Sequence, residues 1–342
     1  MLCSIFLWKN GKMLPVFSKS MMQKEDGMLR ERLAEQGVLI LDGALATELE
    51  RRGCNLQDSL WSAKVLMEEP EKIRQVHEDY FRAGADIGIS ASYQASVQGF
   101  LERGYSAAQA REWIRASVRL LREAGEAYWQ AGGKAAGRPR PIAAASIGPY
   151  GAYLADGSEY RGDYGISEEA LVAFHAERLR LLEEAGADLF ACETIPSLGE
   201  AKAILRAMAQ QGCTLPCWMS FSCRDGVHIS EGTPIAACAE FLDAQDRVEA
   251  IGVNCTAPEY IEGLIREIRR ASGKPIVVYG NSGEAYDPTE KVWHGRETAP
   301  CYADWAPKWY AAGARILGGC CRTTPADIAA IYAWRERMRQ QK

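Results

Sequence analysis

The sequence predicts an α/β protein that folds as a single-domain (β/α)8 barrel, the TIM barrel. Short apolar runs alternate along the chain with amphipathic stretches, which is the pattern of repeated βα units. The same Ala-Gly-Ala triplet closes three amphipathic stretches before a strand, at 83–85, 185–187 and 312–314, and glycine just past a helix end is a common helix stop. A length of 342 residues suits one such barrel. An open, doubly wound sheet is the structural alternative.

Eight apolar runs are the predicted strands. They cover residues 37–43, 85–90, 141–148, 187–193, 217–222, 249–255, 275–281 and 314–319. Helical patterns lie between them: in the stretch 70–85, Ile73, Val76 and Tyr80 recur with the spacing of one helical face. Eight strands joined by helices favour the closed barrel over the open sheet.

Composition and charge narrow the class of protein. Hydrophobic residues make up 47% of the chain and charged residues 25%, which is ordinary for a globular protein. The net charge is -5 and no dense basic stripe occurs, so we expect neither nucleic acid nor a membrane as partner. The eleven cysteines are odd in number and irregular in spacing. They favour free thiols in a reducing cytoplasm over a disulfide framework.

The N-terminal segment differs from the rest of the chain. Residues 1–27 lack the order of a signal peptide, in which positive charge precedes the apolar run. We predict that they form an extension outside the fold and that residues 28–342 form the barrel domain. An N-terminal segment that packs on the barrel is the alternative.

Polar and thiol side chains gather at one end of the predicted barrel. The last residues of the strands, or those directly after them, include Asp42, Ser90, Glu193, Asn254, Cys255, Asn281, Cys320 and Cys321. Active sites of (β/α)8 barrels lie at the carboxyl ends of the strands. This end is therefore the predicted site.

Three of these residues suggest a metal centre. Zn²⁺ takes thiolate ligands in tetrahedral geometry, and three protein ligands leave a fourth position open, as in catalytic sites. Cys255, Cys320 and Cys321 supply three such ligands. Adjacent cysteines can face one ion only if the backbone leaves the extended form, and we expect Gly318 and Gly319 to give that freedom. The alternatives are a buried structural thiol at Cys255 and a redox pair at 320 and 321.

The charge of such a centre indicates its chemistry. Three thiolates around Zn²⁺ leave one net negative charge, which disfavours making hydroxide from bound water. A substrate thiol suits the open position better, because metal coordination deprotonates a thiol whose ordinary pKa is about 8.5. The residues alone therefore favour alkyl transfer to a substrate sulfur.

Seven segments strengthen this interpretation. They read LDGALATELERRGCNLQDSLWSAKVL, SASYQAS, SIGPYGAYLADGSEYRGDY, ACETIPS, GVNC, NSGEAYD and GGCCRTTPADI. With them the chain resembles the homocysteine S-methyltransferase family, in particular its bacterial S-methylmethionine-dependent branch, over roughly residues 38–333. The resemblance implies a (β/α)8 barrel in which Cys255, Cys320 and Cys321 bind catalytic zinc. Homocysteine takes the open position and becomes methionine.

The resemblance also implies residues that bind the substrate. Glu193 of ACET matches the carboxylate that receives the homocysteine amino group, and Asp42 of LDGA matches an acid in the same pocket. Ser90 and Gln94 of SASYQAS and Asn254 of GVNC complete the expected contacts. Asp42 could instead cap the following helix, and Glu193 could form an ordinary strand-end salt bridge.

The methyl donor is expected to be a sulfonium, S-methylmethionine or S-adenosylmethionine. Proteins hold such cations with aromatic faces and carboxylates. Tyr150, Tyr153 and Tyr160, in the acidic segment after the third strand, are the predicted donor contacts. A solvated surface loop is the alternative for this segment.

Other functions stay open at this point. A selenocysteine methyltransferase and a betaine-dependent enzyme are variants of the same family. The betaine variant is disfavoured because Gln94 stands where that branch has a tyrosine. A non-catalytic zinc or thiol sensor is the alternative from a different class.

Overall fold

Eight parallel strands form the centre of this computed structural model. The structure describes residues 27–54, 62–283 and 302–341, together with four short strands outside these ranges. The barrel strands are β3 (Leu39–Ile40), β4 (Ile87–Ile89), β5 (Ile142–Ile147), β6 (Leu189–Ile195), β7 (Cys217–Phe221), β8 (Val248–Asn254), β9 (Ile276–Gly280) and β12 (Ile316–Gly319). They correspond to the eight predicted runs.

The sheet closes on itself. Its strand order is β3-β12-β9-β8-β7-β6-β5-β4, with every neighbouring pair parallel. A parallel bridge between Leu41 and Ile87 joins the two ends of this row. The (β/α)8 barrel predicted from the sequence is therefore confirmed, and the open sheet is excluded.

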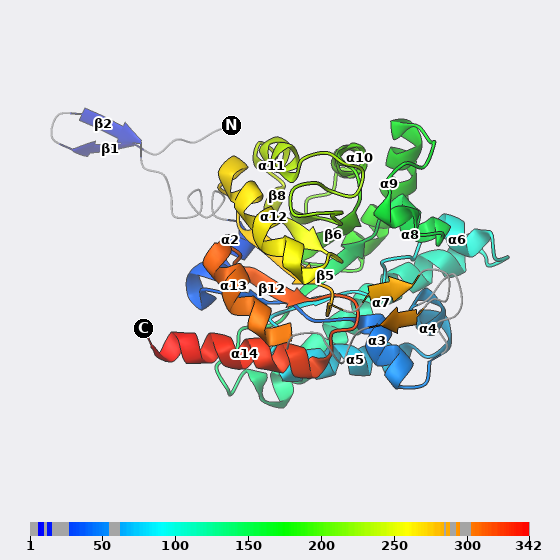
Figure 1. The fold of residues 1–342 in the computed structure, drawn as a ribbon, viewed down its shortest axis with the longest axis horizontal. Coiled ribbons are helices and arrows are strands. Elements are labelled where there is room, and N and C mark those ends of the chain that lie inside the picture. The colour runs from blue at the N-terminus through cyan, green and yellow to red at the C-terminus, as the bar shows by residue number, and fades with distance from the viewer. Residues whose placement is uncertain are drawn as a thin grey trace.

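Helices surround this sheet (Figure 1). They are α2 (Met28–Gln36), α3 (Leu45–Arg51), α4 (Ser62–Glu68), α5 (Pro70–Ala83), α6 (Val97–Leu101), α7 (Ala107–Tyr128), α8 (Tyr150–Leu154), α9 (Glu168–Glu184), α10 (Leu198–Gln210), α11 (Ile235–Asp243), α12 (Pro258–Ala271), α13 (Trp305–Ala312) and α14 (Pro325–Gln340). The predicted apolar face of α5 is buried at Ile73, Val76 and Tyr80. None of the helices in the described part of the chain is both long and apolar enough to cross a membrane.

Four short strands lie outside the barrel sheet. β1 (Phe6–Lys9) pairs with β2 (Lys12–Pro15), and β10 (Ala285–Asp287) pairs with β11 (Val292–His294), both antiparallel. Each pair forms a two-stranded sheet of its own. The first pair falls within the predicted extension.

Two apolar layers hold the barrel together. Alternate residues of a strand point to opposite faces, so one set fills the barrel and the other packs under the helices. Leu39, Leu189, Trp218 and Ile316 belong to the inner layer. Leu29 of α2 joins the same inner cluster.

Helix α2 covers the amino-terminal end of the barrel. Its first amide groups, those of Met28 and Leu29, donate hydrogen bonds of 3.1 and 2.7 Å to the carboxylate of Glu249 in β8. Free N–H groups at a helix start need acceptors and favour negative charge. Glu249 therefore anchors α2 at this end.

A buried ion-pair network fastens the last helix to the first strands. Asp86 accepts hydrogen bonds from Arg335 of α14 at 2.5 Å, from Arg138 at 2.9 Å and from the Ile40 amide at 2.9 Å. Arg335 also donates to the Val38 carbonyl at 3.1 Å. Its side chain is 1% exposed. The network thus ties α14 to the segments of β3 and β4, where the barrel closes.

Replacing Arg335 by leucine is expected to lower the free energy of unfolding by about 3 kcal/mol, because it leaves the buried Asp86 with one cation fewer. Arg339→Leu, one helical turn later and half-exposed, is the control and is expected to change it by less than about 0.5 kcal/mol. Urea denaturation measures both. Equal losses in the two variants would contradict a special role for Arg335.

Candidate active site at the carboxyl ends of the strands

The three predicted metal-binding cysteines lie together. Cys255 follows β8, and Cys320 and Cys321 follow β12. Their sulfur atoms lie within 4.8 Å of one another. Cys255 and Cys320 are bonded as a disulfide, while the sulfur of Cys321 is 3.8 Å from that of Cys255. Among the described residues, no other group of three or more His, Cys, Asp or Glu side chains is placed to hold a metal ion.

The three sulfurs fit a tetrahedral metal once the disulfide is reduced. Ligands at about 2.3 Å in tetrahedral geometry are separated by about 3.8 Å, which is the spacing between Cys255 and Cys321. Burial raises the pKa of Cys321 to about 12, and the charges of Glu159 and Glu193 add to this effect. Cys321 would therefore stay protonated at neutral pH unless a cation binds beside it. A metal ion is such a cation.

The backbone around the cysteines differs in one respect from expectation. Gly318 and Gly319 do not have positive φ angles; Cys255 (45°) and Arg322 (69°) do. A Cβ at Gly318 would collide with Leu41, and one at Gly319 with Thr323. The glycines therefore allow close packing of β12, and the turn that orients the sulfurs lies at other residues.

Glu193 lies in β6 with a buried carboxyl group. The Ser146 hydroxyl donates to its Oε1 at 2.5 Å, and the Tyr279 hydroxyl contributes a second side-chain hydrogen bond. Burial raises the pKa of Glu193 to about 7, against these two hydrogen bonds, which lower it. No basic side chain in the described residues pairs with Glu193, so the ordinary salt bridge considered from the sequence is absent there.

Asp42 points to the same region. Its Oδ2 accepts a hydrogen bond from the Ile89 amide at 2.8 Å, which connects the ends of β3 and β4. Burial raises its pKa well above the usual value, and the nearby charge of Glu193 raises it further. Helix α3 has Ala44 at its N-cap position, so Asp42 is not the helix cap that the sequence left open.

Asn254 supports the site from within the protein. Its Oδ1 accepts hydrogen bonds from the Thr194 amide and the Ser220 hydroxyl, both at 2.7 Å, and its Nδ2 donates to Thr194 Oγ1 at 2.7 Å. Thr194 has a φ of 57°, a strained value for a β-branched residue. Asn254 thus holds the residue next to Glu193 in place.

Ser90 and Gln94 line different parts of this end of the barrel. The Ser90 hydroxyl accepts a hydrogen bond from the Ser146 amide at 3.1 Å. Ser146 is also the donor to Glu193, so Ser90 is one step from the buried carboxyl group. Gln94 donates to the Ala152 carbonyl at 3.2 Å. Its side chain lines a cavity of about 220 Å³ between α6 and α8.

The predicted donor tyrosines separate into two groups. The rings of Tyr150 and Tyr153 lie 4.9 and 5.5 Å from that of Phe174 in α9, so they pack against the outer helices. Tyr160 is 42% exposed. Tyr93 was not among the predicted site residues, and its phenol is near Glu159, Glu193 and Tyr160. Its place within SASYQAS was the one available signal.

A buried network holds the segment that carries these tyrosines. Glu200 accepts a hydrogen bond from the Tyr150 amide at 2.5 Å and one from the Tyr164 hydroxyl at 2.9 Å. His175 Nε2 lies 3.0 Å from Glu200, and Arg178 lies 2.8 Å from His175 Nδ1. Burial lowers the pKa of His175 to about 4, so its ring is neutral and bridges Arg178 and Glu200.

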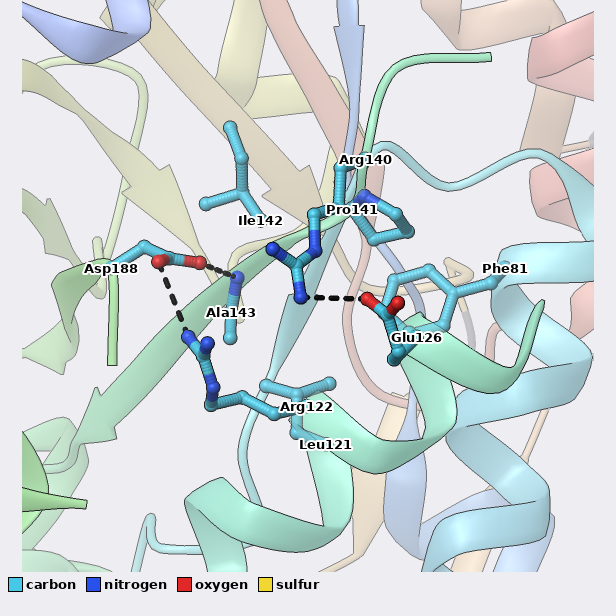
Figure 2. Close-up of a pocket in the computed structure, with 10 residues that line it drawn as sticks. Phe81, Leu121, Arg122, Glu126, Arg140, Pro141, Ile142, Ala143 and Asp188 are labelled. Carbon is cyan, nitrogen blue, oxygen red and sulfur yellow. Dashed lines mark hydrogen bonds and ion pairs between the residues drawn. The ribbon is translucent and has the colours of Figure 1, made fainter. Parts of the chain in front are cut away.

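A small cavity of about 60 Å³ lies at the opposite end of the barrel, near the starts of β5 and β6 (Figure 2). Arg122 pairs with Asp188 at 3.4 Å, and Arg140 with Glu126 at 2.6 Å. Asp188 also accepts the Ala143 amide at 2.8 Å. The charges around this cavity are thus matched within the protein, unlike those near the thiols.

Known proteins resemble this chain along most of its length. Residues 39–334 match the family described as Homocysteine S-methyltransferase. The chain is 56% identical over 297 residues to Homocysteine S-methyltransferase YbgG of Bacillus subtilis, which covers 87% of this chain and 94% of that protein. The chain belongs to the homocysteine S-methyltransferase family. It is an enzyme, and the family transfers a methyl group to homocysteine.

Solved structures and a further relative agree with this assignment. The metallated and oxidized forms of the Escherichia coli homocysteine methyltransferase MmuM each match with a TM-score of 0.80 and 49% identity, covering 90% of this chain and 99% of that one. Selenocysteine Se-methyltransferase of Brassica oleracea is 47% identical over 317 residues, which is 89% of this chain and 91% of that protein. The family predicted from the sequence is confirmed.

The reduced enzyme is expected to bind one metal ion per chain, and Cys321→Ala should lose it because two thiolates remain. Cys238→Ala, which removes a buried thiol in α11, is the control and should keep the metal. Elemental analysis after dialysis under reductant measures both. Unchanged metal content in Cys321→Ala would contradict the site.

Glu193 should make stability depend on pH. Its pKa rises from 4.5 to about 7 on folding, so the favourable contribution present below pH 4.5 is lost as pH rises through 7. Glu193→Gln is therefore expected to raise the free energy of unfolding of the metal-free chain by roughly 2–3 kcal/mol at pH 8. The gain should shrink toward pH 4. Urea denaturation across this range would refute the assignment if the gain were independent of pH.

Proposed function

We propose that this enzyme transfers a methyl group from an amino-acid sulfonium, S-methylmethionine, to the thiol of L-homocysteine, with zinc held by Cys255, Cys320 and Cys321. The observation that carries the proposal is the group of three sulfurs within 4.8 Å of one another, next to the buried Glu193. Thiol ligands and a neighbouring carboxylate suit a substrate that has both a thiol and an ammonium group.

The bond changes are simple. Bound zinc would supply a positive charge that favours the ionised form of a substrate thiol. The homocysteine sulfur forms a bond to the donor methyl carbon, and the carbon–sulfur bond of the sulfonium breaks. Its electron pair stays on the donor sulfur, which leaves as a neutral thioether. The thiol proton passes to solvent, so no basic side chain is needed at the methyl transfer itself.

The surrounding side chains are assigned roles by their positions. Glu193 binds the ammonium group of homocysteine, which restores the charged form of a carboxyl whose pKa burial raises to about 7. Asp42 lies near Glu193, whose charge raises the pKa of Asp42 further. Ser90 orients Glu193 through Ser146, and Asn254 fixes the adjoining backbone. These residues hold the homocysteine sulfur against the donor methyl.

Two variants of this function differ in substrate. Selenocysteine is the alternative acceptor, since a selenolate is also a soft nucleophile and one relative at 47% identity is a selenocysteine Se-methyltransferase. S-adenosylmethionine is the alternative donor, since it presents the same methyl sulfonium. Betaine is disfavoured because its quaternary ammonium calls for an aromatic cage, and Gln94 offers an amide.

The test is methionine formation from homocysteine with S-methylmethionine, S-adenosylmethionine or betaine as donor. We expect turnover with a sulfonium and, in Cys320→Ala, loss of at least about a thousandfold together with the metal, because thiol activation is removed. Cys238→Ala controls for the loss of any thiol. Full metal occupancy without turnover on any donor would overturn the enzyme assignment and favour a zinc sensor.

A further inference from the structure

Glu159 stands out among the acidic residues near the thiols. It lies in the 3-10 turn Ser158–Tyr160, between α8 and α9. Its main-chain carbonyl accepts a hydrogen bond from the Ser222 hydroxyl at 3.3 Å. Because Ser222 directly follows β7, this contact fixes the turn over the carboxyl end of the barrel.

Two glycines allow the turn to sit there. A Cβ at Gly151 of α8 would fall on the backbone of Ser158 and Glu159, so helix and turn pack backbone to backbone. Gly162 has a φ of 81°, and a Cβ there would meet Pro196 and Ser197 at 3.2 Å. The turn is thus held by α8 on one side and by the β6–α10 connection on the other.

The Glu159 side chain has an unused hydrogen-bond acceptor. Its Oε2 is buried and has no hydrogen-bond partner within the described part of the chain. Burial raises the pKa of Glu159, while backbone hydrogen bonds from its own residue and from Gly157 to the carboxylate lower it. Its charge acts on Tyr93 and on Cys321. A buried carboxylate oxygen without a donor costs free energy. A cationic ligand that supplies the donor would remove that cost.

The charged side chains around Glu159 favour a cationic ligand at its carboxylate. Asp42, Glu193 and the thiols are negative or acidic. Arg161 weakly offsets Glu159, but its guanidinium is 64% exposed and lies 3.8 Å from Asp156. Arg322 acts on Cys321 and lies 3.8 Å from Glu50.

We propose that Glu159 binds the α-ammonium group of an amino-acid methyl donor beside the thiols. The inference rests on the proposed function, which brings two amino acids to one metal site. Each then has its own carboxylate, Glu193 for the acceptor and Glu159 for the donor. Betaine has no N–H group to donate, so Glu159 selects amino-acid sulfoniums against it.

The ammonium group, rather than the sulfonium, is the group assigned to Glu159. The sulfonium loses its charge during methyl transfer, so a carboxylate beside it would stabilise the ground state more than the transition state. The ammonium keeps its charge throughout. Its contact contributes equally to both states, which lowers KM for the donor and leaves kcat unchanged.

The test uses Glu159→Gln, which keeps the shape of the side chain and removes its charge. Asp163→Asn removes an exposed charge from the same loop and is the matched control. Calorimetric titration of the reduced zinc enzyme with S-methylmethionine, without homocysteine, should show binding weakened about 10- to 100-fold in Glu159→Gln, as expected for a lost charge-assisted hydrogen bond. Steady-state assays should show the same increase in donor KM, with kcat, homocysteine KM and metal content within about twofold.

The outcomes separate this inference from the proposed function. The role of Glu159 is overturned if wild type and Glu159→Gln bind S-methylmethionine equally, or if Asp163→Asn weakens binding as much as Glu159→Gln does. This holds even if the wild-type enzyme forms methionine. Failure of wild type to bind S-methylmethionine also overturns it. Binding that depends on Glu159 without turnover in wild type supports this inference and contradicts the proposed methyl transfer. If Glu159→Gln lowered turnover with betaine as much as turnover with S-methylmethionine, Glu159 would not select between the two donors.

Discussion

The hydrogen bonding of one strand, β9, determines where the thiols meet. β9 lies between β8 and β12, and its last two carbonyl groups accept the amides of Cys255 and Cys320: Tyr279 O at 3.2 Å and Gly280 O at 2.9 Å. Parallel strands end at the same edge, so these two contacts place cysteines that are 65 residues apart in sequence on either side of one strand end. The Tyr302 hydroxyl adds bonds to the carbonyls of Gly280 and Gly318. The cysteine geometry therefore follows from main-chain pairing.

Around this fixed centre, two buried acid groups have no basic side chain as a partner among the residues that the structure describes. Asp42 and Glu193 are both shielded from water, and the hydrogen bonds they accept come from amides and hydroxyls. Such groups resist ionisation in the empty protein. They become favourable as carboxylates when a positively charged molecule enters. A centre of this kind discriminates by charge as much as by shape, in contrast with the paired arginines and acids at the other end of the barrel.

The sequence predicted the features that follow from the positions of strand ends. It did not predict the features that depend on the direction of a side chain. Eight apolar runs were enough to bring Cys255, Cys320 and Cys321 to one edge, because parallel topology alone requires it. The start of α14 also depends on local sequence, because Asp327 accepts hydrogen bonds from the amide and the hydroxyl of Thr324, both at 2.8 Å. By contrast, the packing of Tyr150 against Phe174 depends on how α8 and α9 meet.

Other features could not be predicted from the sequence, because they depend on residues that are far apart in the chain. Neither Glu200 nor His175 and Arg178 carries a local signal, since each looks like an ordinary helix residue until the fold buries all three together. Asn254 stays a predicted substrate contact, and its hydrogen bonds to Thr194 and Ser220 also join strands distant in sequence. Gly318 and Gly319 suggested unusual backbone angles, but their function is to let strands approach. The spacing of residues in the sequence does not show which residue of another segment packs so closely that only glycine fits.

The anchoring of α2 by Glu249 has a practical consequence for handling the protein. Met28 lies beside Glu249 near the beginning of β8, and the thiols lie beyond the end of this strand, about 20 Å away along its seven residues. A tag, surface linker or fused partner joined at that side is directed away from the reactive face. Immobilised enzyme attached there would keep its substrate entrance toward the solution.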